Sequence, residues 1–284
     1  MTTLAVRSAA AAALLLIGCG PAATGDDTGP TPDAAPLADA APLADGRQDP
    51  PPPPPTDGGG DPTVACRTLH ATIRDFRRGD AGFTGHKDFQ TFMNDRPTLG
   101  LVQATLGPDD KPLFATPQPF PKQIESADTF AQWYRDVQDV NIDIPVDLVL
   151  DPVANQPGYY RYDDDTFFPI DGMGYDERMP AEDGMMHAFH FTTEIHTRFQ
   201  YRGGEVFTFK GDDDLWLFIN KKLAIDLGGL HGKEERTIVL DTLAAQLGLV
   251  VGQTYPMDIF HAERRNDGSH FRVETTIECF TDPG

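Results

Sequence analysis

Short apolar stretches separated by turn-forming residues dominate the chain after residue 65. They contain alternating or continuous apolar side chains and are bounded by Gly, Pro and Asp, a pattern that is typical of β-strands. Strands that alternated with helices would favour a parallel sheet, and that alternation is missing. We therefore predict a mainly β fold, an antiparallel β-sandwich or jelly roll. The predicted strands are 68–76, 101–106, 197–201, 205–210, 215–220, 223–227, 236–240, 255–261 and 271–280.

A few short helices are expected to flank the sheets. Residues 127–137 follow the candidate N-cap Ser126, and their large apolar side chains recur at helical spacing. Residues 88–93 are a second, shorter candidate. Residues 139–183 are rich in Pro, Asp and Gly and show no period that predicts an element.

The first 18 residues are predicted to be a signal peptide. A single Arg7 precedes an apolar run over 9–17 and small residues before Cys19, the order found in secretory signals. The run is too short to remain as a membrane span. Residues 16–19, Leu-Ile-Gly-Cys, also resemble a bacterial lipobox, so we predict that Cys19 is lipidated and becomes the mature N-terminus. An ordinary cleaved signal is the alternative.

Residues 19–65 are predicted to be the lipidated cysteine followed by a disordered tether. The segment is mostly Pro, Ala, Asp, Gly and Thr, and it has too few large apolar side chains to build a core. The prolines at 51–55 favour extended polyproline II, and the glycines at 58–60 favour flexible coil. The tether would reach roughly 140 Å when extended and roughly 40 Å as a coil. It would hold the domain over 66–284 away from the membrane.

The cysteines after Cys19 also frame that domain. Only Cys66 and Cys279 remain, one near each end of it. An exported protein meets an oxidising compartment, so we predict that these two cysteines form a disulfide, which would stabilise the fold by about a few kcal/mol. Two unrelated buried thiols are the alternative.

The chain is strongly acidic, and this excludes some partners. It has 44 acidic and 23 basic side chains and a formal net charge of −21, which would repel nucleic acid phosphates. The few serines lie outside any GxSxG motif, and no nucleotide-binding glycine motif occurs. We expect a protein that is not an enzyme. A glycosidase that uses two of Glu205, Glu263 and Glu274 remains an alternative.

Three consecutive carboxylates, Asp212, Asp213 and Asp214, precede a predicted buried strand. In a regular strand, adjacent side chains point to opposite faces, so Asp212 and Asp213 can reach one ion only where the backbone turns or their peptide bond is cis. Calcium suits such a pair because it accepts about six to eight oxygen ligands in irregular geometry. A solvated acidic turn is the alternative.

Neighbouring loops are expected to complete this site. The turn with the sequence RRNDGSH offers side-chain oxygens, and Asp226 stands before two glycines. Aromatic rings nearby could stack on a sugar, although a tryptophan in a strand is more often in the core. Candidate calcium ligands beyond the pair are Asp214, Asp226, Asn266 and Asp267. Candidate ligand-binding residues are Trp216, His231 and Ser269.

Seven motifs occur in a fixed order between residues 72 and 275: TIRDF, HKDFQTF, QWYRDV, FFPIDG, HAFHFTTE, FTFKGDDDLWLFINKKLAIDLGGLH and FHAERRNDGSHFRVET. Together they resemble the fibro-slime domain family over residues 68–279. That family is known from cell-surface proteins of bacteria and slime moulds. It looks like a branch of the anthrax-protective-antigen-type carbohydrate-binding domain that yeast flocculins share.

The resemblance implies a β-sandwich in which the adjacent aspartates hold calcium and contact a sugar. Asp212 and Asp213 match the pair, but Asp214 stands where the superfamily usually has Gly, and Asn220 and Lys221 replace an Asp-Gly. We therefore expect a lipoprotein of the bacterial cell envelope, on the outer membrane, that binds extracellular carbohydrate or another surface component and touches the membrane only through its lipid. One alternative is a structural or protein-interaction module that calcium only stabilises. The other is an envelope glycosidase.

Overall fold

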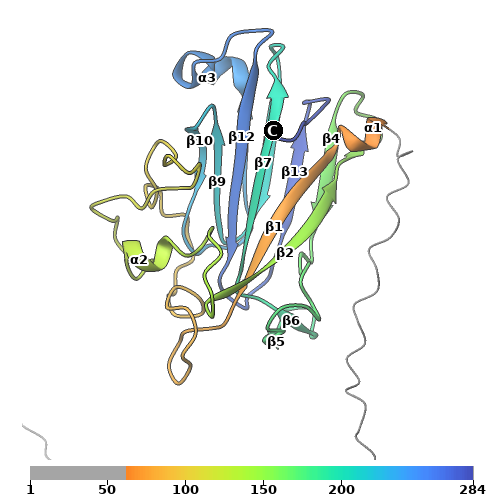
Figure 1. Cartoon of the computed structure of the whole chain (residues 1–284). Helices are drawn as coiled ribbons and strands as arrows, with labels where there is room; N and C mark the ends of the chain where they lie inside the picture. Colours follow the sequence, from red (N-terminus) through yellow and green to blue (C-terminus); the bar gives the residue numbers. More distant parts are fainter. Residues whose placement is uncertain (1–61, 284) are drawn as a thin grey trace, which may run out of the picture. The chain divides into compact units, whose positions relative to one another are not determined.

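The computed structural model describes residues 62–283, and these residues fold into a mainly β unit (Figure 1). Two antiparallel sheets form a sandwich, as the sequence predicts. One has six strands in the order β10 (Lys222–Leu227), β9 (Asp214–Ile219), β12 (Thr254–Glu263), β7 (Phe191–Gln200), β1 (Thr68–Phe76) and β2 (Asn141–Val149). The other has five, in the order β11 (Glu234–Val239), β8 (Val206–Gly211), β13 (Phe271–Thr275), β4 (Tyr160–Asp164) and β3 (Asp151–Pro152).

Smaller elements surround the sandwich. A hairpin of β5 (Arg178–Pro180) and β6 (Met186–Ala188) lies at one end. Three short helices are α1 (Pro62–Ala65), α2 (Ala127–Phe130) and α3 (Leu240–Leu247). No helix among residues 62–283 is long and apolar enough to cross a membrane. The predicted signal peptide, Cys19 and the predicted tether up to residue 61 lie outside the described residues. The last four residues of the tether predicted over 19–65 form α1 instead of a disordered segment.

The six-stranded sheet is buried on both faces where β9 runs. Leu215, Leu217 and Ile219 face the core between the two sheets, whereas Trp216 and Phe218 belong to a second core on the other face. The second core forms because the segment between β1 and β2 packs its own apolar side chains against that face. These are Phe89, Leu101, Val102, Leu106, Ile124, Phe130, Trp133 and Tyr134.

This second core explains where the predicted elements were wrong. Residues 101–106 make only isolated bridges, at Val102 and Thr105, and residues 88–93 form turns rather than a helix. The helix predicted over 127–137 is confirmed only for α2, which begins at its N-cap Ser126 with a capping box to Thr129. The apolar side chains of Phe130, Trp133 and Tyr134 are all buried in the second core. Packing against the sheet therefore explains why apolar residues recur in this segment, although the helix is only one turn long.

Register places the ends of several strands together. Asp214 pairs with Ala262, and Gly211 pairs with Phe271. The β8–β9 junction, the end of β12 and the start of β13 therefore lie at one end of the sandwich, the end where the β5–β6 hairpin lies (Figure 1). The helix α3 lies at the opposite end (Figure 1).

The predicted disulfide between Cys66 and Cys279 is confirmed. It spans 213 residues and joins the segment before β1 to the segment after β13, with the two Cα atoms 4.4 Å apart. Such a bond fits an oxidising compartment.

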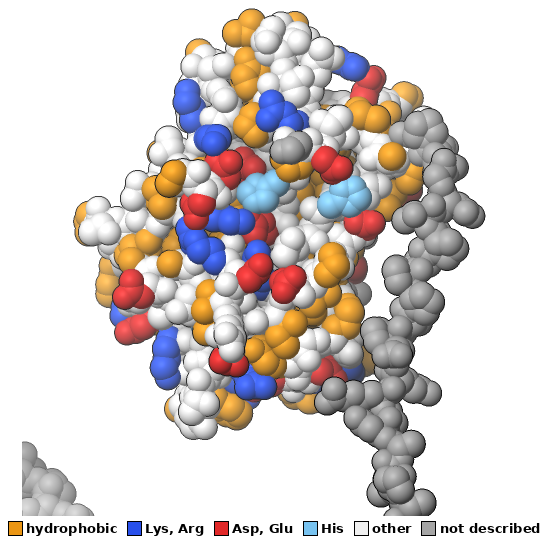
Figure 2. Space-filling model, viewed as in Figure 1, with side chains coloured by type: hydrophobic (Ala, Val, Ile, Leu, Met, Phe, Trp, Pro, Cys, Tyr) orange, Lys and Arg blue, Asp and Glu red, His pale blue; other side chains and the backbone are white. Residues whose placement is uncertain are grey.

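A charged cluster lies on the outer face of β7 and β12. Glu194 accepts hydrogen bonds from Arg74, at 2.6 Å, and from Lys111, while His196 contacts both Glu194 and Asp258. Figure 2 shows one face of the molecule, on which acidic, basic and histidine side chains lie among apolar ones. Lys111 thereby attaches the segment between β1 and β2 to the sheet.

Candidate functional site

A cavity of about 430 Å³ opens at the end of the sandwich where β8 meets β9. Its wall comes from the β8–β9 junction, the segment after β10, the turn after β12, the β5–β6 hairpin and the segment between β1 and β2. The lining residues are Asn94, Asp95, Glu182, Asp212, Asp213, His231, Gly232, Lys233, Arg265, Asp267, Gly268 and His270.

Asp212 and Asp213 both line this one cavity. The peptide bond between them is cis, one of the two backbone arrangements that the calcium hypothesis requires. Asp212 is held by His270, whose backbone N–H donates to Oδ1 at 2.7 Å and whose ring Nδ1 lies 2.6 Å from Oδ2. The Asp212 carbonyl oxygen lies 2.6 Å from Nε2 of the buried His261. Asp212 is therefore held in place by His270 and His261.

Asp213 and Glu263 are two buried carboxylates at the site, and their pKa values are raised. Burial raises the pKa of Asp213 well above its usual value; Arg264 opposes this, and Asp214 and Asp212 add to it. Burial, then Asp213 and Asp212, likewise raise the pKa of Glu263 well above its usual value. Only 1% of Glu263 is exposed, its Oε1 accepts the N–H of Arg265 at 3.2 Å, and the Ser269 side chain also opposes the rise of its pKa. Within the described part of the chain, its Oε2 has no hydrogen-bond partner of good geometry. Asp213 accepts the N–H groups of His231 at 3.3 Å and of Arg264 at 3.1 Å. Two buried carboxylates this close together still favour a nearby cation, because it would neutralise their charge.

Asp214 has a different role from the one predicted. It is fully buried, its Oδ2 lies 2.6 Å from Nε of Arg264, and its Oδ1 accepts the N–H of Gly229 at 2.5 Å. Arg264 also donates to the carbonyl oxygen of Gln123 at 2.7 Å. Both carboxylate oxygens of Asp214 are thus engaged beneath the cavity, which it does not line.

Two further predicted residues lie away from the cavity. Trp216 is fully buried in the second core, so it cannot stack on a ligand, and the competing core assignment is the one that the structure supports. Asp226 accepts the indole N–H of Trp216 at 3.1 Å and the N–H of Gly100 at 2.8 Å. It stabilises the β9–β10 region and does not join the acidic pair.

Of the predicted residues in the turn after β12, only Asp267 lines the main cavity. Asp267 lines the cavity and lies 3.3 Å from Nε of Arg265. Asn266 turns away and accepts a hydrogen bond from Gln90 at 2.5 Å. Ser269 is buried and lines an adjoining cavity. His231 lines the main cavity, but it is buried, and its ring nitrogens contact the carbonyl oxygens of Gly232 and Leu227.

Several lining residues were missed by the sequence analysis. His270 directly follows Ser269, and Lys233 lies two residues after His231. Because Ser269 and His231 were already candidates, this closeness in sequence could have indicated His270 and Lys233 as well. Asn94, Asp95 and Glu182 reach the cavity from segments distant in sequence. Nothing in their local pattern indicates this.

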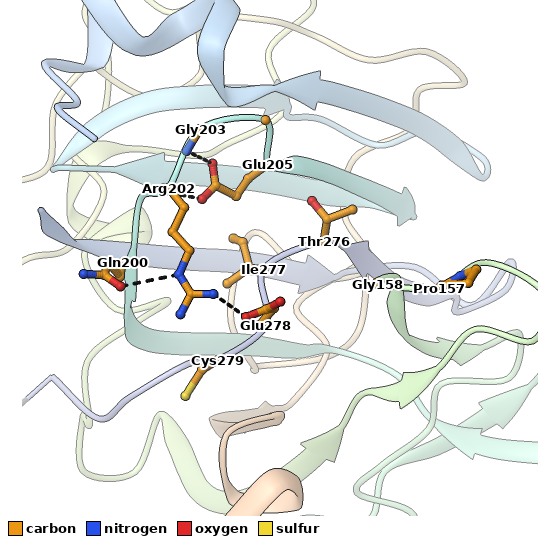
Figure 3. Close-up of a pocket in the computed structure, with 11 residues that line it drawn as sticks. Pro157, Gly158, Gln200, Arg202, Gly203, Glu205, Thr276, Ile277, Glu278 and Cys279 are labelled. Atoms are coloured by element: carbon orange, nitrogen blue, oxygen red, sulfur yellow. Dashed lines mark hydrogen bonds and ion pairs between the residues drawn. The ribbon is translucent and has the colours of Figure 1, made fainter. Parts of the chain in front are cut away.

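The three glutamates of the glycosidase alternative have different surroundings in the fold. Glu205 lies in a separate cavity of about 330 Å³ at the other end of the sandwich, where its carboxylate accepts the N–H of Gly203 (Figure 3). The same view shows Arg202 pointing to Glu278. Glu274 pairs with Arg161 and Arg272, and Glu263 is buried beside Asp213.

The donor set partly fits a hard cation. Within residues 62–283, no group of three or more His, Cys, Asp and Glu side chains has the arrangement of a ready metal centre. The unpartnered Glu263 Oε2 and the two cavity aspartates are hard oxygen donors of the kind that calcium prefers. Backbone carbonyls, water or ligand hydroxyls would have to supply the remaining oxygens.

Comparison with known proteins gives a family match for part of the chain and relatives over most of it. Residues 181–278 match the family model described as the PA14 domain, and this range includes Asp212, Asp213 and Glu263. The chain is related to proteins of Dictyostelium discoideum. It is 40% identical to protein psiQ over 207 residues, which are 70% of this chain and 20% of that protein. It is 40% identical to protein psiD over 217 residues, 74% of this chain and 41% of that protein. The chain thus spans less than half of these relatives.

Solved structures give a weaker likeness. A PA14 sugar-binding domain from an RTX adhesin is 13% identical with a TM-score of 0.24, over 32% of this chain and 49% of that chain. The A domain of epithelial adhesin 6 from Candida glabrata, in complex with Galb1-3GlcNAc, is 19% identical with a TM-score of 0.22, over 36% of this chain and 49% of that chain. TM-scores this low do not establish a shared fold.

Proposed function

We propose that this protein binds extracellular carbohydrate at the Asp212–Asp213 cavity in a calcium-dependent manner and takes part in adhesion. One observation carries the proposal: both adjacent carboxylates line a single cavity, and the buried Glu263 beside them has an unpartnered oxygen. The PA14 match over 181–278 supports it because that range contains all three carboxylates. The motif resemblance to fibro-slime domains points to the same class.

The residues of the cavity divide into two roles in this proposal. Asp212, Asp213 and Glu263 supply negative charge for the ion, and Asp267 can approach it from the rim. Calcium held by these residues would offer open coordination positions to the hydroxyl oxygens of a sugar. Lys233, Asn94 and Asp95 line the same cavity and can donate or accept hydrogen bonds at the sugar. The walls thus orient the ligand without reacting with it, so the proposed activity is binding without catalysis.

The proposed cellular setting follows from the N-terminal sequence and the disulfide. The Cys66–Cys279 bond agrees with export. A signal over 1–18, lipidation at Cys19 and a tether over 20–61 would anchor the domain at a membrane surface. The relatives psiQ and psiD come from Dictyostelium discoideum and lend no support to a bacterial envelope, so that part rests on the lipobox pattern alone.

Calcium binding is tested with purified protein by metal analysis and by thermal unfolding with calcium or with chelator. Saturating calcium at about 100 times its Kd should raise the unfolding free energy by about 2.7 kcal/mol. Asp213→Asn should lose this increase, and the exposed Asp143→Asn should keep it. An unfolding curve of the natural protein that calcium leaves unchanged would refute the calcium part.

Carbohydrate binding is tested on a glycan array with calcium and with chelator. We expect binding only with calcium, lost in Asp213→Asn. The competing proposal is a protein-interaction module in which calcium only stabilises the loops. In that case Asp213→Asn would lower the melting temperature, and partner capture would persist while the array stayed empty.

A further inference from the structure

A second cavity, of about 260 Å³, adjoins the first. Glu182, Gly268 and His270 line both, so the two cavities form one extended cleft. The second cavity lies between the β5–β6 hairpin and the turn after β12, and the acidic pair does not line it. A ligand that filled only the first cavity would leave this part of the cleft to solvent.

Phe168 is the aromatic side chain in the wall of the second cavity. It is half-buried, and its ring stacks on that of His187, with centroids 3.8 Å apart and planes 7° apart. His187 is itself clamped: Nδ1 lies 2.6 Å from Asp171 and Nε2 lies 2.9 Å from Asp183. The Phe168 ring is therefore held in one orientation from behind.

The rest of this wall is polar and acidic. Asp165, Glu182 and Asp183 contribute carboxylates, of which Asp165 pairs with Lys233 and Asp183 with His187. The carboxylate oxygens that remain free accept hydrogen bonds from hydroxyl groups, and three carboxylates beside these two partners repel anions. A fixed aromatic ring beside such acceptors matches a pyranose, which presents an apolar C–H face and hydroxyls at its edge. A sugar that carries a carboxylate would meet this wall unfavourably.

We propose that the cleft binds a neutral oligosaccharide across two subsites, with one sugar at Asp212 and Asp213 and the next packed on Phe168. This inference rests on the proposed carbohydrate binding at the first cavity. It assigns the stacking role to Phe168 in place of Trp216, which the core buries, and it makes a chain of at least two sugars the preferred ligand.

The test compares the affinities of the full chain, in calcium, for neutral monosaccharides, for the neutral di- and trisaccharides built from them and for sialylated versions. The natural protein should bind a neutral oligosaccharide about tenfold more tightly than its monosaccharide. Phe168→Ala should remove this difference and leave monosaccharide affinity unchanged. Tyr159→Ala is the matched control, since Tyr159 is a half-buried aromatic in a cavity at the other end of the sandwich. Phe168→Leu keeps the apolar volume without the flat ring, and it should behave as Phe168→Ala does.

The outcomes separate the two proposals. Sugar binding with equal affinities for mono- and oligosaccharides, unchanged in both Phe168 variants, overturns the second subsite and leaves the first intact. Tighter binding of sialylated than of neutral chains overturns the neutral ligand class. Binding of no sugar by the natural protein removes the proposed function, and the second subsite falls with it.

Discussion

Asp214 and Arg264 form a salt bridge of 2.6 Å in which neither side chain is exposed. Removing one partner of such a pair leaves a buried charge uncompensated, so Asp214→Asn should lower the unfolding free energy by about 3 to 5 kcal/mol. Denaturant unfolding measures this value. Because Asp214 lies beneath the cavity, the loss should be the same with calcium and with chelator, unlike the effect of Asp213→Asn.

The exposed pair of Lys233 and Asp165, whose charged atoms are 2.7 Å apart, provides the comparison. Asp165→Asn should change stability by less than about 1 kcal/mol because solvent screens an exposed pair. A calcium-dependent loss in Asp214→Asn would instead place Asp214 among the metal ligands, and the structural role would then be wrong.

The disulfide gives a second prediction. Cys66 and Cys279 close a loop with a sequence separation of 213 residues. The chain-entropy model assigns a loop of this length about 5 kcal/mol, an upper estimate because the reduced unfolded chain retains some structure. The double variant Cys66→Ser/Cys279→Ser should therefore unfold at clearly lower denaturant concentration, and reduction of the natural protein should reproduce the change. Equal midpoints for the oxidised and reduced protein would contradict this.

The sandwich was predictable because many of its strands are short apolar runs bounded by turn residues, and β13 also alternates between buried and partly exposed positions. The strand β9 shows the limit of such patterns. All its residues are buried, so the sequence cannot assign Trp216 to a face. That assignment depends on the second core, which forms when Trp133 and Tyr134 pack on the sheet from a largely irregular segment. Helical spacing in that segment therefore predicted a longer helix than the structure has.

The candidate site was predictable in part for a similar reason. The adjacency of Asp212 and Asp213 is local, and a turn or cis peptide is a local requirement of any shared ion. Glu263 comes close only because β12 pairs with β9, with Ala262 opposite Asp214. Glu182 reaches the cavity from a hairpin in the segment that showed no predictive period. Register and loop placement, rather than residue type, decide which carboxylates meet.

His196 should make stability depend on alkaline pH. Burial lowers its pKa, but hydrogen bonds to Asp258 and Glu194 outweigh this and raise it to about 9. A raised histidine pKa stabilises the fold fully below about 6.5, and this contribution is lost as the pH rises to about 9. The advantage of the natural protein over His196→Gln should therefore shrink by about 3 kcal/mol across that window, as measured by urea unfolding. A constant difference from pH 6 to 10 would contradict the buried ion pair.

Asp75 should produce a second window in which stability falls as the pH rises, this time on the acidic side. Only 1% of this residue is exposed, and its Oδ2 accepts the N–H of Tyr175 at 2.5 Å. Burial raises its pKa from 3.8 to about 7, the Tyr175 hydrogen bond opposes the rise, and Glu177 and Asp176 add to it. The folded protein thus keeps a proton that the unfolded chain releases above about pH 4.

A raised carboxyl pKa stabilises the fold fully below the unfolded value, and the contribution is lost as the pH approaches 7. Relative to Asp75→Asn, which cannot titrate, the natural protein should lose on the order of 4 kcal/mol between about pH 4 and 7 and change little above that. Urea unfolding at one-unit pH intervals measures the difference, with Asp143→Asn on the exposed face of β2 as the control. Parallel curves for the natural protein and Asp75→Asn would mean that Asp75 is ionised throughout, and that Tyr175 and its surroundings solvate the charge.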